Sequence, residues 1–194
     1  MAPNQLVQIQ EYLRLVSPMV HSVARKPISH METLEFRQDT AGSAHPWRFQ
    51  AQNMSDGTLR ALGVLTALFQ SNLDYSPTLI GIEEPETALH PAASAALREA
   101  LVSASETTQV LVTSHSPDLL DDPGIEADAV LAVVSDAGET KIAPLDEGSR
   151  EMMQRHLFSA GELLRKNQLE PDHASLEQQD KAASGDLFGG MDSV

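Results

Sequence analysis

Two short apolar runs separated by a helical segment constrain the fold of this chain more than any other feature. "TLIGI" at residues 78–82 and "QVLVT" at residues 109–113 are nearly all apolar, as expected of strands that are covered on both faces of a parallel sheet. Between them, His90-Pro91 is expected to open a helix that runs to about residue 103, because proline is tolerated in the first turn. A strand, a helix and a strand in this order form a right-handed crossover. The pattern predicts an α/β fold with a mostly parallel sheet and flanking helices.

Charged side chains follow each of these two strands. Glu83 and Glu84 end the first strand, and His115 comes shortly after the second. The carboxyl ends of parallel strands meet at one edge of a sheet, where ligands bind in open α/β folds. One acid at such an edge can hold Mg²⁺ through water, and the other can orient an attacking water molecule. Taken alone, the two glutamates also fit the simpler reading of surface acids after a strand.

The remaining sequence predicts further helices and strands before and after this strand-helix-strand unit. Apolar residues at helical spacing and short alternating runs predict a helix within 4–25, strands at 31–37 and 46–52, and a helix that starts at Ser55. Downstream we expect a short helix after Ser116-Pro117, a hairpin of residues 129–135 and 140–145 at the sheet edge, and helices at about 147–157 and 160–168.

The expected organisation has three parts. Residues 1–52 form a helix and strands that lead into a lobe at residues 53–171. Residues 172–194 are polar, small and without periodicity, so we predict a disordered tail.

Composition narrows the class of protein. The 194 residues carry a formal net charge of -15, and all but five of the 28 acidic residues lie after residue 60. Such an acidic surface disfavours non-specific nucleic-acid binding by this chain alone. The sequence has no cysteine, no secretory signal and no apolar run long enough to span a bilayer. We expect a cytoplasmic protein that makes no contact with a membrane.

Three consecutive segments resemble motifs of ABC-type ATPases. "NMSDGTLRALGVLTAL" at 53–68 resembles the ABC signature, and "TLIGIEEPETALHP" at 78–91 resembles Walker B followed by the D-loop. "QVLVTSHSPDLL" at 109–120 resembles the switch segment, with His115 in the place of the switch histidine. "FSAGELLRKNQLEPD" at 158–172 is similar to the C-terminal end of the same ATPases. Order and spacing match the RecF/SMC-like predicted AAA ATPases, which include the ATPase part of the OLD nucleases. The resemblance covers about residues 50–172.

This resemblance implies a role for each matching residue. Glu83 would hold Mg²⁺, Glu84 would polarise the attacking water, and His115 would contact the γ-phosphate of ATP. Ser55, with the backbone N–H groups around Asp56 and Gly57, would bind phosphate at a helix N-terminus. In the family this signature reaches the nucleotide of a second subunit. The implied assembly is a homodimer, or a pair with a related ATPase chain.

The phosphate-binding loop of such ATPases, G-x-x-x-x-G-K-[ST], does not occur in this sequence, which contains no Gly-Lys dipeptide. That loop supplies backbone donors and a lysine to the phosphates. Three explanations remain open: a C-terminal part of a longer ATPase, a split gene whose loop lies on another chain, or a degenerate remnant. We favour the first.

Two functions are consistent with these observations. In one, the chain is the C-terminal lobe of an ATPase that couples ATP hydrolysis to subunit engagement. The resemblance associates such ATPases with DNA repair, chromosome maintenance or phage defence, with DNA bound through the full-length assembly. In the other, the chain is a non-catalytic module that binds or regulates a partner carrying the phosphate-binding loop.

Overall fold

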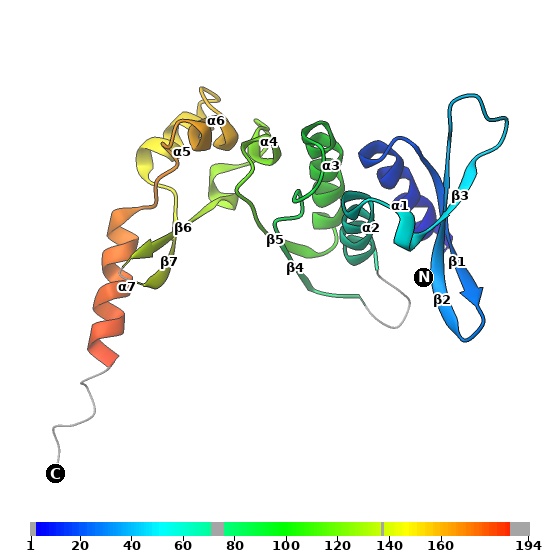
Figure 1. Cartoon of the computed structure of the whole chain (residues 1–194). Coiled ribbons are helices and arrows are strands. Elements are labelled where there is room, and N and C mark those ends of the chain that lie inside the picture. The colour runs from blue at the N-terminus through cyan, green and yellow to red at the C-terminus, as the bar shows by residue number, and fades with distance from the viewer. Residues whose placement is uncertain (1–2, 71–75, 137, 187–194) are drawn as a thin grey trace, which may run out of the picture. The chain divides into compact units, whose positions relative to one another are not determined.

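The computed structural model describes residues 3–70, 76–136 and 138–186. They belong to two compact units, Met1–His115 and Ser116–Val194 (Figure 1). The division falls inside the range 53–171 that the sequence predicts as one lobe. Within the described part of the chain, every helix is too short or too polar to cross a membrane.

The first unit begins with a helix and an antiparallel sheet. Its elements are α1 (Pro3–Val16), β1 (Val20–Ile28), β2 (Met31–Gln38), β3 (Trp47–Gln50) and the 3₁₀ helix η1 (Ala51–Asn53), with sheet order β1-β2-β3. The strand predicted at 31–37 is confirmed as β2. The helix predicted within 4–25 ends earlier, at Val16, because Pro18 disfavours a helical conformation at Ser17. The chain then turns into β1, a strand that the sequence pattern did not indicate.

The predicted β-α-β unit follows. Its elements are α2 (Asp56–Leu68), β4 (Leu79–Glu83), the 3₁₀ helix η2 (Pro91–Ala93), α3 (Ser94–Ser105) and β5 (Gln109–Thr113). β4 and β5 pair in parallel, and Glu83 lies beside Thr113 in the register. His90 caps η2 through its Nδ1, which accepts from the backbone N–H of Ala92 at 3.1 Å. The parallel pairing is confirmed and places the ends of both strands at one edge.

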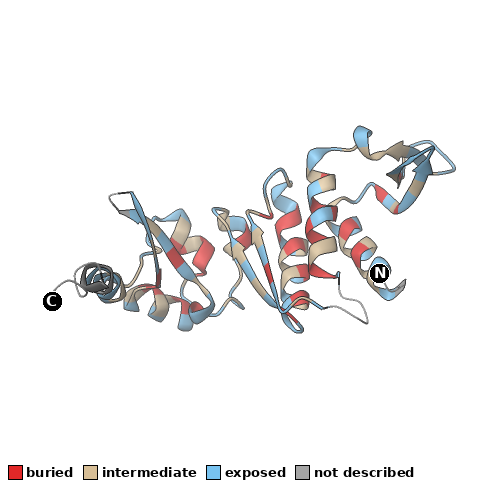
Figure 2. Ribbon diagram, turned by 90° about the horizontal axis from the view of Figure 1, so that it is seen from below, coloured by how far each residue is buried: buried red, intermediate tan, exposed pale blue. Residues whose placement is uncertain are grey.

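Much of the core of the first unit lies among the helices α1, α2 and α3. Figure 2 shows the buried residues gathered on the facing sides of these helices. α1 contributes Ile9 and Leu13, which are almost completely buried, and α2 contributes Leu65. The rings of Tyr12 and Phe69 stack with centroids 5.5 Å apart. The apolar faces of α2 and α3 therefore fix the position of the two parallel strands beside them.

One face of the parallel sheet is open, which corrects the prediction of strands covered on both faces. Ile80 is 6% exposed, whereas its neighbour Leu79 is 54% exposed and Leu111 is 56% exposed. Residues alternate between the two faces of a strand, so Glu83 lies on the same open face as Leu79. Among the described residues of this unit, helices cover only the other face of the pair.

The second unit is built around a separate hairpin. Its elements are α4 (Pro117–Leu120), the 3₁₀ helix η3 (Ala127–Ala129), β6 (Leu131–Asp136), β7 (Glu139–Pro144), α5 (Glu147–Gln154), α6 (Ala160–Arg165) and α7 (His173–Asp186). The predicted hairpin is confirmed as the antiparallel pair β6-β7. Its predicted place at the edge of the parallel sheet is wrong, because β6 and β7 form a two-stranded sheet of their own. Beneath it lies a buried cluster of small and apolar side chains: Ala127, Ala132, Leu145, Met153, Ala160 and Leu163.

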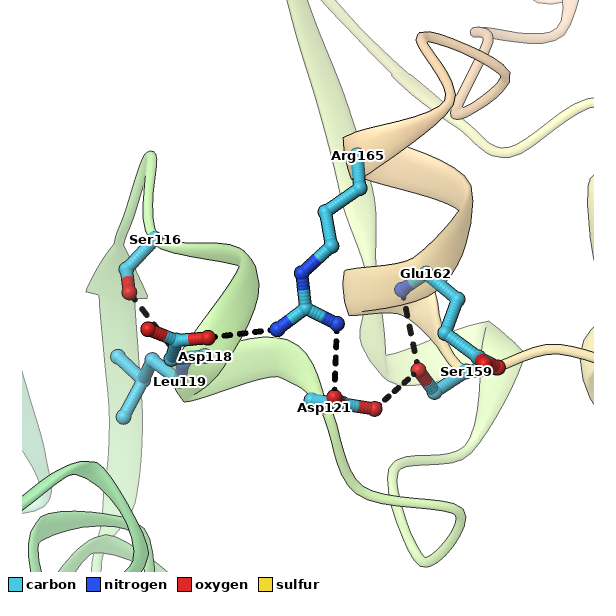
Figure 3. Close-up of polar contacts among 7 residues, drawn as sticks. All are labelled: Ser116, Asp118, Leu119, Asp121, Ser159, Glu162 and Arg165. Carbon is cyan, nitrogen blue, oxygen red and sulfur yellow. Dashed lines mark hydrogen bonds and ion pairs between the residues drawn. The ribbon is translucent and has the colours of Figure 1, made fainter. Parts of the chain in front are cut away.

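A polar network joins α4 to α6 (Figure 3). The Arg165 guanidinium donates to Asp118 Oδ1 at 2.6 Å and to Asp121 Oδ2 at 2.8 Å. Asp121 also accepts from Ser159 Oγ at 2.7 Å, and Ser159 forms a capping box with Glu162 at the start of α6. The hydrogen bonds that Arg165 donates to Asp121 and Asp118 raise its pKa above the ordinary value. Asp118, a first-turn acid by sequence, is thus held within its own unit.

Residues His173–Asp186 form helix α7, which corrects the prediction of disorder over that part of the tail. Ser175 donates its backbone N–H at 3.1 Å and its hydroxyl at 2.6 Å to Asp172 Oδ2, and these bonds lower the pKa of Asp172. Lys141 of β7 pairs with Asp180 at 2.7 Å. Polar capping and cross-element pairing support this helix, and neither produces apolar periodicity. Residues 187–194 lie outside the described part of the chain.

Replacing Arg165 by methionine should loosen the contact of α4 with α6, because Asp118 and Asp121 lose the donor that they share. We expect faster amide exchange in peptides covering residues 117–122, measured by hydrogen-exchange mass spectrometry, and a lower midpoint of thermal unfolding. Arg155→Met is the matched control, since Arg155 makes an exposed pair with Glu151 on one helix and such pairs contribute little. Equal exchange in the two variants would contradict the assigned role of Arg165.

Candidate functional site

The candidate site lies where β4 and β5 end. The backbone N–H of Glu84 donates to the Thr113 carbonyl at 2.9 Å, which extends the parallel ladder by one residue beyond Glu83. Immediately afterwards the chain leaves the strand conformation, and Glu84 has a φ of 41°. This left-handed conformation costs a residue with a side chain about 1–2 kcal/mol. Surrounding contacts must hold Glu84 in it.

The turn brings Glu84 to His115. Glu84 Oε1 lies 3.6 Å from His115 Nε2, and Glu84 Oε2 accepts from Thr87 Oγ1 at 3.2 Å. The His115 side chain is 90% exposed, so its other faces are open to a ligand. Catalytic hydrogen bonds are often longer before the substrate binds. The structure thus brings together two of the side chains that the strand topology predicts at this edge.

Arg60 is a residue of this site that the sequence reasoning missed. Arg60 lies on α2, and its guanidinium Nη2 donates to the carbonyl oxygens of both Glu83 and Glu84 at 2.8 Å. The pattern of α2 indicates only that Arg60 belongs to its polar side. A contact between residues 23 positions apart in the sequence has no local signal.

Glu86 is bonded to the residue that follows β5. Ser114 Oγ donates to Glu86 Oε1 at 2.6 Å. Glu86 Oε2 is buried and has no hydrogen-bond partner among the described residues. The bond fastens the turn after β4 to the residue that precedes His115.

The start of α2 is a capped helix N-terminus. Ser55 Oγ accepts from the backbone N–H of Thr58 at 3.2 Å and lies 2.9 Å from Thr58 Oγ1, which also lies 3.0 Å from Ser17 Oγ. Asp56 is exposed in the first turn. The Ser55 hydroxyl therefore already has a structural partner in this chain, whereas the resemblance implies a phosphate contact for it.

Gly57 packs directly against the turn that follows Glu84. A Cβ atom at Gly57 would collide with the carbonyl oxygen of Ala88, a residue whose φ is 66°. Glycine is therefore required here by a backbone contact inside the chain, independently of any ligand. The candidate phosphate-binding turn and the glutamate-bearing turn are in contact.

The donor set at this edge is compatible with Mg²⁺ bound together with a phosphate. Among the described residues no three His, Asp or Glu side chains are grouped as a complete metal cage. Mg²⁺ keeps several waters and is often held by one or two carboxylates plus substrate phosphates, so the exposed Glu83 carboxylate fits that chemistry. A cleft of about 270 Å³ lies elsewhere, between α1 and the ends of α2 and α3, and includes no candidate site residue.

The family of the chain follows from a sequence match that begins just before β1 and ends just after α4. Residues 17–121 match the family model described as "AAA domain, putative AbiEii toxin, Type IV TA system". This match covers more than half of the chain. The chain belongs to this AAA-domain family. None of the curated proteins is similar enough in sequence to match it.

Solved structures of SMC ATPases have a similar fold. One comes from work on the ATP-driven dimerization and DNA-stimulated activation of SMC ATPases. Its TM-score is 0.54 at 14% identity. The match covers 79% of this chain and 90% of the chain in that structure. Another is the Smc head domain from Pyrococcus furiosus, with an extended coiled coil and bound to the C-terminal domain of ScpA. Its TM-score is 0.52 at 14% identity, and this chain spans 37% of its length. The AAA domain thus has an α/β fold of the P-loop ATPase type.

Replacing Gly57 by alanine should force the start of α2 away from Ala88. We expect the free energy of unfolding to fall by roughly 1–3 kcal/mol, as for other overpacked sites. The measurement is urea denaturation followed by circular dichroism. Gly63→Ala in the same helix is the control, because nothing lies within 4 Å of its added Cβ. A helical alanine at that position should stabilise by about 0.5–1 kcal/mol. Equal effects of the two changes would contradict the packing role.

Proposed function

We propose that this chain is the C-terminal lobe of an ABC-type ATPase and contributes the hydrolytic part of a composite ATP site. The proximity of Glu84 to His115 at the ends of two parallel strands is the observation that carries the proposal. A carboxylate held by a left-handed turn beside an exposed imidazole is suited to orient a water molecule and to contact a phosphate. Membership of an AAA-domain family supports an ATPase-type function.

Each site residue has a proposed role. Glu83 would hold Mg²⁺ through water on the open face of β4, and the ion would supply neutralisation of phosphate charge when bound. Glu84 would accept a hydrogen bond from the attacking water and orient it. His115 would donate a hydrogen bond to the γ-phosphate. Ser55 and the N–H groups around Asp56 and Gly57 would bind phosphate at the start of α2, on the nucleotide of a second subunit.

The phosphate-binding loop would come from another part of the assembly. It would lie on a longer form of this protein, on a homodimer of such a form, or on a related ATPase chain. The SMC ATPase with the similar fold undergoes ATP-driven dimerization and DNA-stimulated activation. By analogy we propose nucleotide-dependent pairing in the cytoplasm, with DNA contacts through the full assembly and a role in DNA repair, chromosome maintenance or phage defence.

The absence of G-x-x-x-x-G-K from the sequence favours a second candidate function. Without that loop, the chain would serve as an interaction module that binds or regulates a loop-bearing partner. Isothermal calorimetry with Mg·ATP separates the two candidates. The titrations use the full chain alone and the full chain co-purified with a loop-bearing polypeptide encoded upstream. If the site is composite, the full chain alone should not bind Mg·ATP. The co-purified pair should bind it, and more strongly than the loop-bearing polypeptide does by itself. No added binding would support the interaction module.

The change Glu84→Gln should preserve assembly and ATP binding while slowing turnover about 10²–10⁴-fold, because the amide is a poor acceptor for the water proton. Steady-state phosphate release by the assembly and nucleotide binding by calorimetry are the two measurements. Glu99→Gln, on the exposed side of α3, is the control and should leave turnover unchanged. Normal hydrolysis by Glu84→Gln would remove Glu84 from the role.

A further inference from the structure

Two consecutive carbonyl groups converge on one nitrogen of Arg60. The Nη2 atom lies 2.8 Å from the carbonyl oxygen of Glu83 and 2.8 Å from that of Glu84. In a regular strand successive carbonyl groups point in opposite directions, so one donor cannot serve both. They converge here because Glu84 leaves the strand with a φ of 41°. The arginine contacts and the left-handed residue are therefore parts of one arrangement.

We infer that Arg60 is a positioning residue that holds Glu84 in its left-handed conformation. The guanidinium is always charged, and its hydrogen bonds to carbonyl oxygens are charge-assisted and short. If φ of Glu84 returned to the negative values that side chains prefer, the carbonyl groups would diverge and one or both bonds would be lost. The inference rests on the proposed role of Glu84.

The direction of the Glu84 side chain depends on this conformation. The orientation of the Cα–Cβ bond follows φ, and the carboxylate that it carries lies 3.6 Å from His115 Nε2. Thr87 Oγ1 holds the other carboxylate oxygen at 3.2 Å, but this contact belongs to the same turn and would move with it. Arg60 contacts the turn from a different element, the helix α2. It is placed to resist a rotation that the contact within the turn cannot resist.

The arrangement also links the two candidate turns. Arg60 lies about 1.4 helical turns after Ser55, the N-cap of α2, and Gly57 between them packs on the Ala88 carbonyl. A movement of the start of α2, such as one caused by phosphate binding there, would act on Glu84 through both contacts. Arg60 thereby joins the phosphate-binding turn to the residue proposed to orient the water.

The first test measures backbone conformation and needs no nucleotide. The ¹³Cα and ¹³Cβ chemical shifts of Glu84 in the isotope-labelled full chain report the sign of its φ. We expect left-handed shifts in the unchanged chain and a change toward extended values in Arg60→Met. Arg14→Met is the matched control, because Arg14 also donates from a helix to a backbone carbonyl, that of His21, at 2.8 Å. This control should leave Glu84 unchanged.

Unchanged Glu84 shifts in Arg60→Met would overturn the inference, and so would equal changes in Arg60→Met and Arg14→Met. If Arg60→Met does not fold, Arg60→Gln is read in the same way, since its shorter amide cannot reach both carbonyl groups.

The second test uses the assembly in which Glu84→Gln slows ATP turnover. Arg60→Met should reduce kcat by up to about 10²-fold, as misplacement of a catalytic group does. Adding Arg60→Met to Glu84→Gln should not lower kcat further, because both changes act through the Glu84 side chain. Independent, multiplicative losses would overturn the positioning role. A complete lack of ATP hydrolysis by the unchanged assembly would count against the proposed function alone, since the chemical shifts test Arg60 separately.

Discussion

The parallel pairing of β4 with β5 is the constraint on which the candidate site depends. The pairing extends to the backbone N–H of Glu84, whose bond to Thr113 is the last rung of the ladder. The segment from this rung to the start of η2 is irregular: it contains the left-handed Glu84, a fully buried Pro85 and a left-handed Ala88. A strained segment of this kind keeps its shape only because the strands, α2 and Ser114 hold it from three sides. The site is therefore only as well positioned as the strands that support it.

The sequence predicts the parts of this site that depend on short-range pattern. Apolar runs that end in charged residues placed Glu84 and His115 at one edge, because the right-handed crossover leaves few alternatives. The contacts that shape the turn could not be predicted. Arg60 reaches Glu84 across 24 positions, and the requirement for glycine at residue 57 comes from a carbonyl 31 residues away. Such contacts depend on the packing of α2 against β4, which no local signal encodes.

The fold differs from prediction where a backbone restriction or polar interactions outweigh the hydrophobic pattern. α1 stops at a proline although apolar residues continue at helical spacing as far as Val20, which becomes a buried residue of β1. α7 forms although its sequence has little apolar periodicity, because Asp172 caps its start and Lys141 binds its side. The prediction of a covered sheet is wrong for a related reason. A run of apolar residues indicates that a strand is suited to burial, but it does not identify what buries it.

The open face of β4 and β5 has a thermodynamic consequence for the chain. Leu79 and Leu111 remain more than half exposed in the folded state, and each strand has one edge without a partner among the described residues. Any protein surface that covers this face binds the folded chain but not the unfolded one. At partner concentrations above Kd, the folded chain is therefore stabilised in proportion to the logarithm of the free partner concentration divided by Kd. The stability of this AAA domain would thus be linked by mass action to any partner that binds this face, and the amount of folded protein in a cell would follow the supply of that partner.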